Sequence, residues 1–598
     1  MEIRVRSNSM PEPRGLRKRL RVRTRLALTV IVLALLPGKP TGQDDAASSE
    51  RAPVAGRSKV ATEYGVVAAS QPLAARAGVQ VLERGGSAVD AAIAANAVLG
   101  LVEPPMNGVG GDLFAIIYEA KTGRLYGLNS GGWAPTGLSA AFLRAKGMNR
   151  MPSAGIYTVT VPGAVAGWAA LHARFGKLAF SDLLAPAIFY AEHGFPVSDV
   201  IANFWSVTAR PFASDPNFAK TYLIDGRAPK AGEIFKNPDL ASTLRQIAEK
   251  GRDGFYTGRI AEAILSTSRK AGGTMTAADL QEFEPEWVDP ISTSYRGWTV
   301  WELPPNTQGI AALMMLNIMG QFPLAEYGFH NVKALHVMIE AKKLAYADML
   351  RYVADQRFAK TPVPEMLSKT HAQARARLID ARKAQCTVEP SQLDGLTDSK
   401  GNDTIYLSVI DKDGNIVSLI QSLYSYFGSG VVPSGTGFML HNRGALFTLQ
   451  ADHPNVLAPR KRPLHTLIPG FMQKDDVRIG FGIQGGFNQA QAHAQFVANI
   501  ADYGMDIQQA LEAGRFTKGT FAGCDVQIEA LVPERARNDL RLLGHDITVV
   551  PPRSGGFGYG QAVMSNGSGV HFGASEPRHD GAAIPEAPPV PFLKRPAG

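Results

Sequence analysis

Residues 401–418 read Gly-Asn-Asp-Thr-Ile-Tyr-Leu-Ser-Val-Ile-Asp-Lys-Asp-Gly-Asn-Ile-Val-Ser, and they determine how the rest of the chain is interpreted. A polar segment ends at Asp403, and two strands of alternating pattern then begin at Thr404. If the chain cut itself before Thr404, a threonine would become the new N-terminus at the start of a strand. The freed α-amino group, with a pKa of about 7.7–8.0, can act as a base toward the hydroxyl of the same residue. Most threonines that begin strands only form strands, so the rest of the sequence must support this hypothesis.

The composition is that of a globular enzyme, with 45% hydrophobic and 19% charged residues in 598. The net charge of +9 comes almost entirely from residues 1–42, which hold ten Lys or Arg against two Glu. Because the remainder is close to neutral, the basic balance does not indicate nucleic-acid binding.

Residues 1–42 are predicted to be a secretion signal. A basic region ends at Arg25, and residues 26–36 form an apolar run that Pro37-Gly38 interrupts. The run is too short to span a bilayer comfortably, and it contains no cysteine for a lipid anchor. We therefore expect an exported protein, periplasmic or extracellular, that contacts a membrane only if the leader stays uncleaved. The two cysteines, Cys386 and Cys524, could pair in that compartment, but one pair is no disulfide framework, and we expect unpaired thiols.

Helical and strand patterns alternate in clusters along the chain. Helices are expected at residues 73–84, 88–102, 332–352 and 488–500, and strands at 113–118, 298–303, 527–528 and 546–550. Residues 368–403 are polar and poorly periodic, as an accessible segment ahead of a processing site would be. Strand clusters between helix clusters indicate a layered α+β domain.

One glycine motif allows two interpretations. Gly480-Phe-Gly-Ile-Gln-Gly485 matches GxGxxG, but no βαβ pattern surrounds it, so a dinucleotide site is the weaker interpretation. Alternatively, the backbone N–H groups of Gly485-Gly486 stabilise an oxyanion. The sequence has no GxSxG, P-loop or HExxH motif and no metal-ligand spacing, so we expect neither cofactor nor metal.

Several motifs carry a resemblance to a known family. In order, they are Gly85-Gly-Ser-Ala-Val-Asp-Ala-Ala92, Glu103-Pro-Pro-Met-Asn-Gly-Val-Gly-Gly-Asp112, Thr160-Val-Pro-Gly163, Glu302-Leu-Pro-Pro-Asn-Thr-Gln-Gly309, Asp411-Lys-Asp-Gly-Asn415, Phe427-Gly428, Pro459-Arg-Lys-Arg-Pro463 and Gly485-Gly486. Over residues 61–550 the chain thereby resembles the γ-glutamyltranspeptidase family of N-terminal-nucleophile hydrolases. The resemblance implies an αββα sandwich that cleaves itself between Asp403 and Thr404 into a large subunit, residues 43–403, and a small catalytic subunit, residues 404–598.

The resemblance also implies the catalytic residues. Thr404 corresponds to the nucleophile, Ser422 to a second hydroxyl residue bonded to it, and Gly485 and Gly486 to the oxyanion hole. The implied reaction is attack of the Thr404 hydroxyl on an amide carbonyl, giving an acyl-enzyme that water or an amine releases.

The substrate pocket departs from the family pattern. Ser130-Gly-Gly-Trp133 stands where the family has the arginine that binds the α-carboxylate. The other departures are Arg443 and Leu446 for the Gln and Asp that face the ammonium, His465-Thr466 for two serines, Tyr424 for an asparagine, Tyr406 for a histidine, and a short lid at Val456-Leu-Ala-Pro459. Arg443 places a cation where the family pattern has an acceptor for the substrate ammonium. We therefore expect the pocket to prefer an acyl group with a plain carboxylate over a γ-glutamyl group, as in the acylase-like or oxamate-hydrolase-like branches.

The leading hypothesis is thus a self-processing amidohydrolase or acyltransferase acting on small carboxylate-bearing acyl amides, with no nucleic-acid partner. The main alternative is γ-glutamyl transfer with glutathione hydrolysis. A non-catalytic binding homologue and a dinucleotide oxidoreductase are further alternatives.

Overall fold

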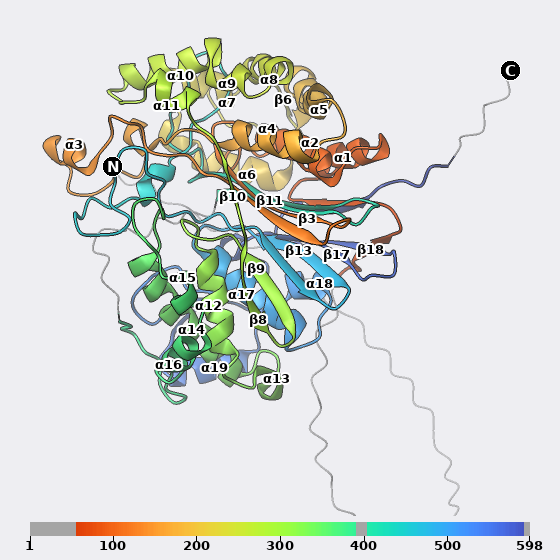
Figure 1. The fold of residues 1–598 in the computed structure, drawn as a ribbon, viewed down its shortest axis with the longest axis vertical. Coiled ribbons are helices and arrows are strands. Elements are labelled where there is room, and N and C mark those ends of the chain that lie inside the picture. The colour runs from red at the N-terminus through yellow and green to blue at the C-terminus, as the bar shows by residue number, and fades with distance from the viewer. Residues whose placement is uncertain (1–55, 390–402, 591–598) are drawn as a thin grey trace, which may run out of the picture. The chain divides into compact units, whose positions relative to one another are not determined.

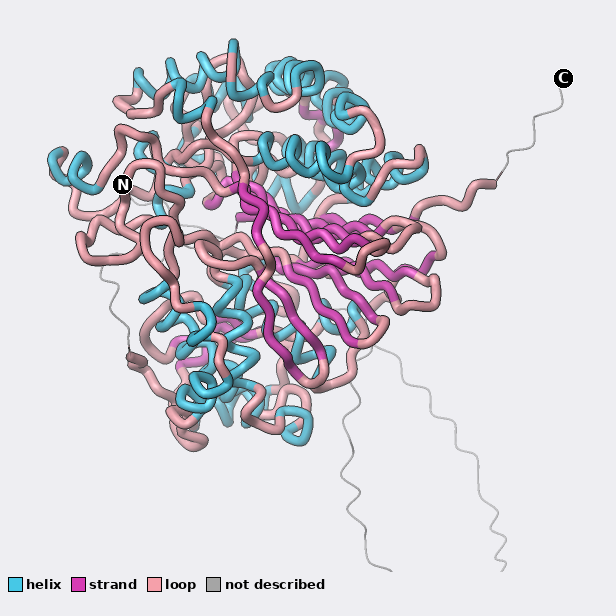
Figure 2. The backbone as a smooth tube through the Cα atoms, viewed as in Figure 1, coloured by secondary structure: helices cyan, strands magenta, loops and turns pink. Residues whose placement is uncertain are grey.

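The computed structural model describes residues 56–389 and 403–590. Two β-sheets lie face to face between two groups of helices (Figures 1 and 2). Each has seven strands, and neighbouring strands within each sheet are antiparallel. The predicted αββα sandwich is confirmed. No helix of the described ranges is long and apolar enough to cross a bilayer.

The two sheets are named after the strands that matter most for the site. The β10 sheet runs in the order β19 (Ala582–Pro585), β2 (Val66–Ala69), β10 (Asp403–Ile410), β11 (Ile416–Tyr424), β3 (Asp112–Glu119), β4 (Arg124–Ser130) and β7 (Glu286–Val288). The β13 sheet runs in the order β1 (Val60–Thr62), β18 (His571–Ser575), β17 (Gly560–Ser565), β13 (Val477–Ile483), β12 (Gly470–Lys474), β9 (Trp298–Glu302) and β8 (Ile291–Tyr295). Each sheet contains strands from both sides of the Asp403–Thr404 bond, so a cut there leaves both chains in both sheets.

Helices cover the outer face of each sheet. The β10 sheet shares a core with α1 (Pro72–Glu83), α2 (Ala88–Val102), α4 (Ala164–Phe175), α5 (Phe180–His193), α6 (Asp199–Thr208), α8 (Pro238–Lys250) and α10 (Gly258–Lys270). The β13 sheet shares a core with α12 (Gly309–Met319), α14 (Val332–Tyr352), α17 (Asn488–Ala501), α18 (Ile507–Glu512) and α19 (Glu534–Leu542).

Local sequence explains where the predicted helices begin. The Gln71 side chain accepts the N–H of Leu73 at 2.6 Å, and proline occupies the first position of α1. Ser87 and Asp90 form a reciprocal capping box at the start of α2. The helices predicted at residues 73–84, 88–102, 332–352 and 488–500 are confirmed to within one residue at each end.

Alternation along β10 sends Thr404 toward the β13 sheet. Ile405, Leu407 and Val409 pack against the helices, whereas Tyr406 and Ile410 lie in the core between the two sheets. Because successive side chains of a strand point to opposite faces, Thr404 shares the inner face with Tyr406.

Two glycines of the GxGxxG match are explained by this packing. A Cβ on Gly482 would lie 2.4 Å from the ring of Tyr406, and one on Gly480 would lie 2.6 Å from Ile416. The neighbours of β13 are the antiparallel strands β12 and β17, so no βαβ unit surrounds the motif. The glycines therefore allow the sheets to approach, which removes the basis of the dinucleotide interpretation.

Two sequence predictions are wrong. Residues 369–376 are not irregular but form α16 (Lys369–Ala376), since Ser368 caps it and Arg375 Nε donates to Asp348 of α14 at 2.7 Å. Cys386 and Cys524 are not free thiols but form a disulfide, with their Cα atoms 4.7 Å apart. Residues 390–402 and the predicted leader lie outside the described residues.

Candidate active site

Thr404 lies opposite an irregularity in the neighbouring strand. Asp403 pairs with Tyr424 and Ile405 pairs with Gln421, so Ser422 and Leu423 of β11 together face Thr404. Such bulges redirect side chains and are frequent beside active sites. The Thr404 hydroxyl is buried and donates to Ser422 Oγ at 3.3 Å, and the N–H of Tyr424 donates to the same oxygen at 2.7 Å. The predicted pair of hydroxyl residues is therefore brought together.

Tyr424 ends β11 with a φ of +80°, which is an uncommon conformation for a residue with a bulky side chain. Its ring lies against the guanidinium of Arg443, with 4.5 Å between Arg443 Cζ and the ring centroid. Because such strain persists only where the surroundings impose it, the bend at Tyr424 is a candidate functional feature. Tyr424 thus lies between the bulge at Ser422 and the guanidinium of Arg443.

Gly485 and Gly486 link β13 to α17 with φ values of +136° and +55°, which favour glycine. The Gly485 carbonyl accepts the N–H of Asn488 at 2.8 Å. In a trans peptide the N–H points opposite to the carbonyl, so this contact fixes the direction of the Gly486 N–H. Neither glycine N–H has an acceptor within residues 56–389 and 403–590. The pair thus offers two donors, as an oxyanion site needs.

Gln308 connects these glycines to the pocket. Its buried Nε2 donates to the carbonyl of Gly486 at 2.8 Å and to the carbonyl of Thr466 at 2.6 Å. Its own N–H donates to the carbonyl of His465 at 2.9 Å. One side chain therefore holds the predicted oxyanion segment and the His465-Thr466 segment together.

Arg443 is wholly buried in the short turn η3 (Arg443–Leu446). Its Nη1 donates to Thr466 Oγ1 at 2.7 Å, and its Nε lies 3.9 Å from Asp112 Oδ2. In the described part of the chain, Nε and Nη2 have no hydrogen-bond acceptor. A buried guanidinium N–H that lacks an acceptor is costly, so Nη2 is a candidate contact for an anionic group. Leu446, in the same turn, is buried and contributes only an apolar side chain.

Asp112 is the counter-ion of this pocket. Its Oδ1 accepts the N–H of Gly132 at 2.9 Å, and its Oδ2 lies 3.0 Å from His465 Nε2 and 3.2 Å from His441 Nδ1. Burial opposes ionisation of Asp112, but the contacts with the two histidines outweigh it and hold its pKa below the usual range.

His465 is held as a neutral imidazole. Burial, reinforced by the Arg443 cation, lowers its pKa to about 3. Its Nδ1 accepts the N–H of Leu467 at 3.2 Å, so the proton lies on Nε2 and points to Asp112. Both ring nitrogens thus form hydrogen bonds within the protein, and His465 contributes to the pocket by holding Asp112.

Sequence reasoning missed Asp112, His441 and Gln308 as site residues, although Asp112 and Gln308 lie in motifs that it noted. The Gly110-Gly111 pair before Asp112 was the available signal. A Cβ on Gly111 would lie 2.5 Å from the carbonyl oxygen of Ser422, so the start of β3 must pass close to the site.

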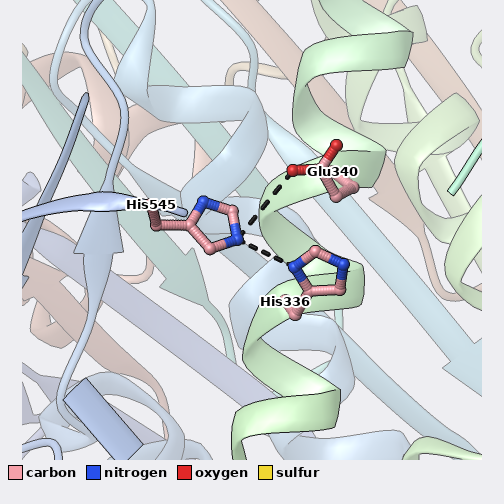
Figure 3. Close-up of side chains that lie close together, drawn as sticks. All are labelled: His336, Glu340 and His545. Carbon is pink, nitrogen blue, oxygen red and sulfur yellow. Dashed lines mark hydrogen bonds and ion pairs between the residues drawn. The ribbon is translucent and has the colours of Figure 1, made fainter. Parts of the chain in front are cut away.

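The cluster of His336, Glu340 and His545 is the one set of described residues with metal-ligand spacing (Figure 3). His336 Nδ1 and His545 Nε2 already share a hydrogen bond of 2.8 Å, and Lys343 Nζ forms an ion pair with Glu340 at 2.6 Å. A divalent ion would face that buried lysine cation and displace the contact between the histidines. His545 Nδ1 has no hydrogen-bond partner among the described residues, but the atoms that would face an ion are already paired, so the cluster fits a buried polar network better than a metal centre.

A four-layer sandwich of two antiparallel sheets, with a threonine at the start of a central strand, defines the class of N-terminal-nucleophile hydrolases. The chain belongs to the γ-glutamyltranspeptidase family, whose model matches residues 74–586. It is thus a self-processing amidohydrolase of that family.

Three relatives illustrate the match. The chain is 36% identical over 517 residues to the glutathione hydrolase-like YwrD proenzyme of Bacillus subtilis, covering 86% of this chain and 96% of that protein. It is 34% identical over 531 residues to the oxamate amidohydrolase proenzyme of Klebsiella pneumoniae, covering 87% and 98%. The crystal structure of cephalosporin acylase from Bacillus halodurans is 40% identical with a TM-score of 0.81, covering 88% of this chain and 97% of that one.

Proposed function

We propose that Thr404 is the nucleophile, that it is released by cleavage after Asp403, and that the enzyme hydrolyses amides whose acyl group carries a carboxylate. The observation that carries the substrate proposal is the buried Arg443, whose Nη2 has no hydrogen-bond acceptor among the described residues. The same pocket is tied to the predicted oxyanion glycines through Thr466 and Gln308.

The mechanism follows from the contacts at Thr404. The new α-amino group accepts the hydroxyl proton as Thr404 Oγ1 attacks the substrate carbonyl, and Ser422 keeps the hydroxyl in place. The N–H groups of Gly485 and Gly486 stabilise the tetrahedral oxyanion, an effect worth about 2.7–4 kcal/mol per donor in comparable sites. The C–N bond then breaks, the amine leaves with the proton, and water repeats the sequence on the ester.

The pocket disfavours a γ-glutamyl group because its ammonium finds no acceptor. The oxygens of Asp112 are already engaged by Gly132, His441 and His465. Leu446 and Tyr424 stand at the positions where the family pattern has polar acceptors. A zwitterionic head would therefore bury an unpaired ammonium, whereas a simple carboxylate would meet Arg443.

Two further points support hydrolysis of such amides. The lid Val456-Leu-Ala-Pro459 is short, so water reaches an acyl-enzyme readily. One relative is, by its name, an oxamate amidohydrolase, and oxamate is an amide whose acyl group carries a carboxylate.

The test compares three 4-nitroanilides on the processed enzyme. Glutaryl and γ-glutamyl anilides differ only in the ammonium, and the pentanoyl anilide lacks both charges. We expect kcat/KM for the glutaryl compound to exceed that of each of the others by at least about tenfold. Faster turnover of the γ-glutamyl anilide would overturn the substrate proposal and favour glutathione-type substrates.

We also propose that the protein is exported. A disulfide persists in oxidising compartments and is rare in the cytosol, so the Cys386–Cys524 pair supports the interpretation of residues 1–42 as a leader. Cell fractionation, with the N-terminus of the mature protein determined, tests this. A cytosolic protein with residues 1–42 intact would contradict it.

A further inference from the structure

The disulfide spans the bond that self-processing breaks. Cys386 lies before Asp403 and Cys524 lies after Thr404, and the two are 138 residues apart in sequence. The proposed cut between Asp403 and Thr404 therefore falls inside the loop that the disulfide closes. Cleavage opens this loop without separating its two arms.

The segment around Cys386 is bonded to the small subunit on both sides. The N–H of Gly523 donates to the carbonyl of Cys386 at 2.8 Å, and the N–H of Ala384 donates to the carbonyl of Leu543 at 2.7 Å. The chain is thus held in register with residues on both sides of Cys524. This arrangement fixes the last described part of the large subunit against the small one.

The polar network beneath the disulfide also joins the two subunits. Figure 3 shows His336 and Glu340 on one helix, α14, facing His545, which comes from the small subunit. Lys343, also on α14, donates to the carbonyl of Gln385 at 2.8 Å and lies 4.0 Å from Cys524 Sγ. Lys342 donates to the carbonyl of Thr520 at 2.9 Å. The His336–His545 and Lys342–Thr520 contacts cross the subunit boundary, and Lys343 lies against both Gln385, the neighbour of Cys386, and Cys524.

We propose that the Cys386–Cys524 disulfide is an inter-subunit tether that makes the mature enzyme a covalently joined heterodimer. The proposal rests on the proposed cleavage before Thr404. Two chains that share both sheets need no tether while folded, but once unfolded they diffuse apart. The tether keeps each subunit at a high effective concentration for the other and holds the segment around Cys386 against the small subunit.

The two cysteines lie at the surface of the folded protein. Cys386 is exposed and Cys524 is partly exposed, so we expect a dithiol to reduce the bond without unfolding the enzyme. Dithiothreitol supplies two electrons and two protons, converts the disulfide to two thiols and is itself oxidised to its cyclic disulfide. Neither cysteine lies among the site residues, so the active site stays intact.

Denaturing gel electrophoresis of the purified enzyme, alkylated with iodoacetamide before loading, tests the tether. Without reductant, the processed wild type should run as one species containing both subunits, and with reductant as two bands. Cys386→Ser and Cys524→Ser should each give two bands without reductant. Two bands from the unreduced wild type would overturn the tether and leave the proposed cleavage standing. A single band in the reduced lane shows instead that cleavage fails, and the tether proposal fails with it.

Thermal unfolding provides a second readout. The untethered heterodimer unfolds into two separate chains, so its Tm should rise with protein concentration, whereas the Tm of the tethered enzyme should not. We expect a concentration-dependent Tm for Cys524→Ser and a constant one for wild type. The Thr404→Ala precursor with Cys524→Ser is the matched control, since its chain is continuous and its Tm should stay constant. The same concentration dependence in wild type and Cys524→Ser would contradict the tether.

Discussion

Replacement of Arg443 by methionine removes the cation of the pocket and keeps an unbranched apolar stem in its place. In the native protein, Nη1 is used by Thr466, and Nε faces Asp112 Oδ2 at 3.9 Å. Nη2 lacks an acceptor in the described residues and is the group that we propose meets a substrate carboxylate. The variant therefore loses about one charge-assisted hydrogen bond to substrate.

The expected loss in kcat/KM follows from the loss of this one hydrogen bond. One hydrogen bond to a charged group contributes about 1.5–3 kcal/mol, which corresponds to about 10- to 150-fold in kcat/KM. We expect Arg443→Met to lower kcat/KM for the glutaryl anilide by this factor. The pentanoyl anilide, which has no carboxylate, should change by no more than about threefold.

The assay is initial-rate release of 4-nitroaniline by processed enzyme. Arg443→Lys is the matched control, because it keeps the charge but loses the planar fork, and its loss should be intermediate. Reduced denaturing gels and the Tm show whether each variant still processes and folds. Equal losses for the glutaryl and pentanoyl anilides would refute the reasoning, since they would show that Arg443 supports the fold and not the acyl carboxylate.

Three other changes test separate parts of the account. Gln308→Met removes the Nε2 donors to the carbonyls of Gly486 and Thr466, which hold the oxyanion segment against the His465-Thr466 segment. We expect kcat to fall about tenfold or more with KM little changed, and a rise in KM at constant kcat would contradict this. Gly482→Ala places a Cβ 2.4 Å from the Tyr406 ring and should lower the free energy of unfolding in urea by about 1–3 kcal/mol. Gly519→Ala is the control, since its Cβ meets nothing within 4 Å, and should lower it by less than about 1 kcal/mol. Equal effects would refute the packing argument. Burial and the neighbouring guanidinium lower the pKa of His465 to about 3. Below pH about 6.5 the unfolded chain therefore binds more protons at this residue than the folded protein does, so Tm should fall as pH drops from about 6.5 toward 4. A flat Tm over this range would be inconsistent with a buried neutral imidazole.

The fold could be predicted from the sequence where local signals agree with the tertiary structure. Pro72 and Ser87 mark helix starts, and the strand pattern after Asp403 continues as two paired strands. The order of the motifs then led to the family and its four layers. The start of α16 at Lys369 was missed because the helix is short and polar, and it is stabilised by the ion pair between Arg375 and Asp348 on another helix.

The sequence indicated some residues of the candidate site but not the contacts that connect them. Position by position, the sequence indicated Thr404, Ser422 and Arg443, and the structure brings Thr404 within hydrogen-bond distance of Ser422. The contacts of Asp112 with His465 and of Gln308 with Thr466 and Gly486 join segments between 158 and 353 residues apart, and no local pattern encodes them. The same holds for the disulfide, since two cysteines 138 residues apart show nothing of their proximity.

The most direct test of the central claim is the intact mass, under reducing and denaturing conditions, of the wild type beside Thr404→Ala and Thr404→Ser. We predict that the wild type yields a small chain of residues 404–598 with threonine at its N-terminus. Thr404→Ala should remain one chain, and Thr404→Ser, which keeps a hydroxyl, should still be cut at the same bond. A wild type that stays whole, or a Thr404→Ala chain cut at the same bond as fast as the wild type, would contradict the account.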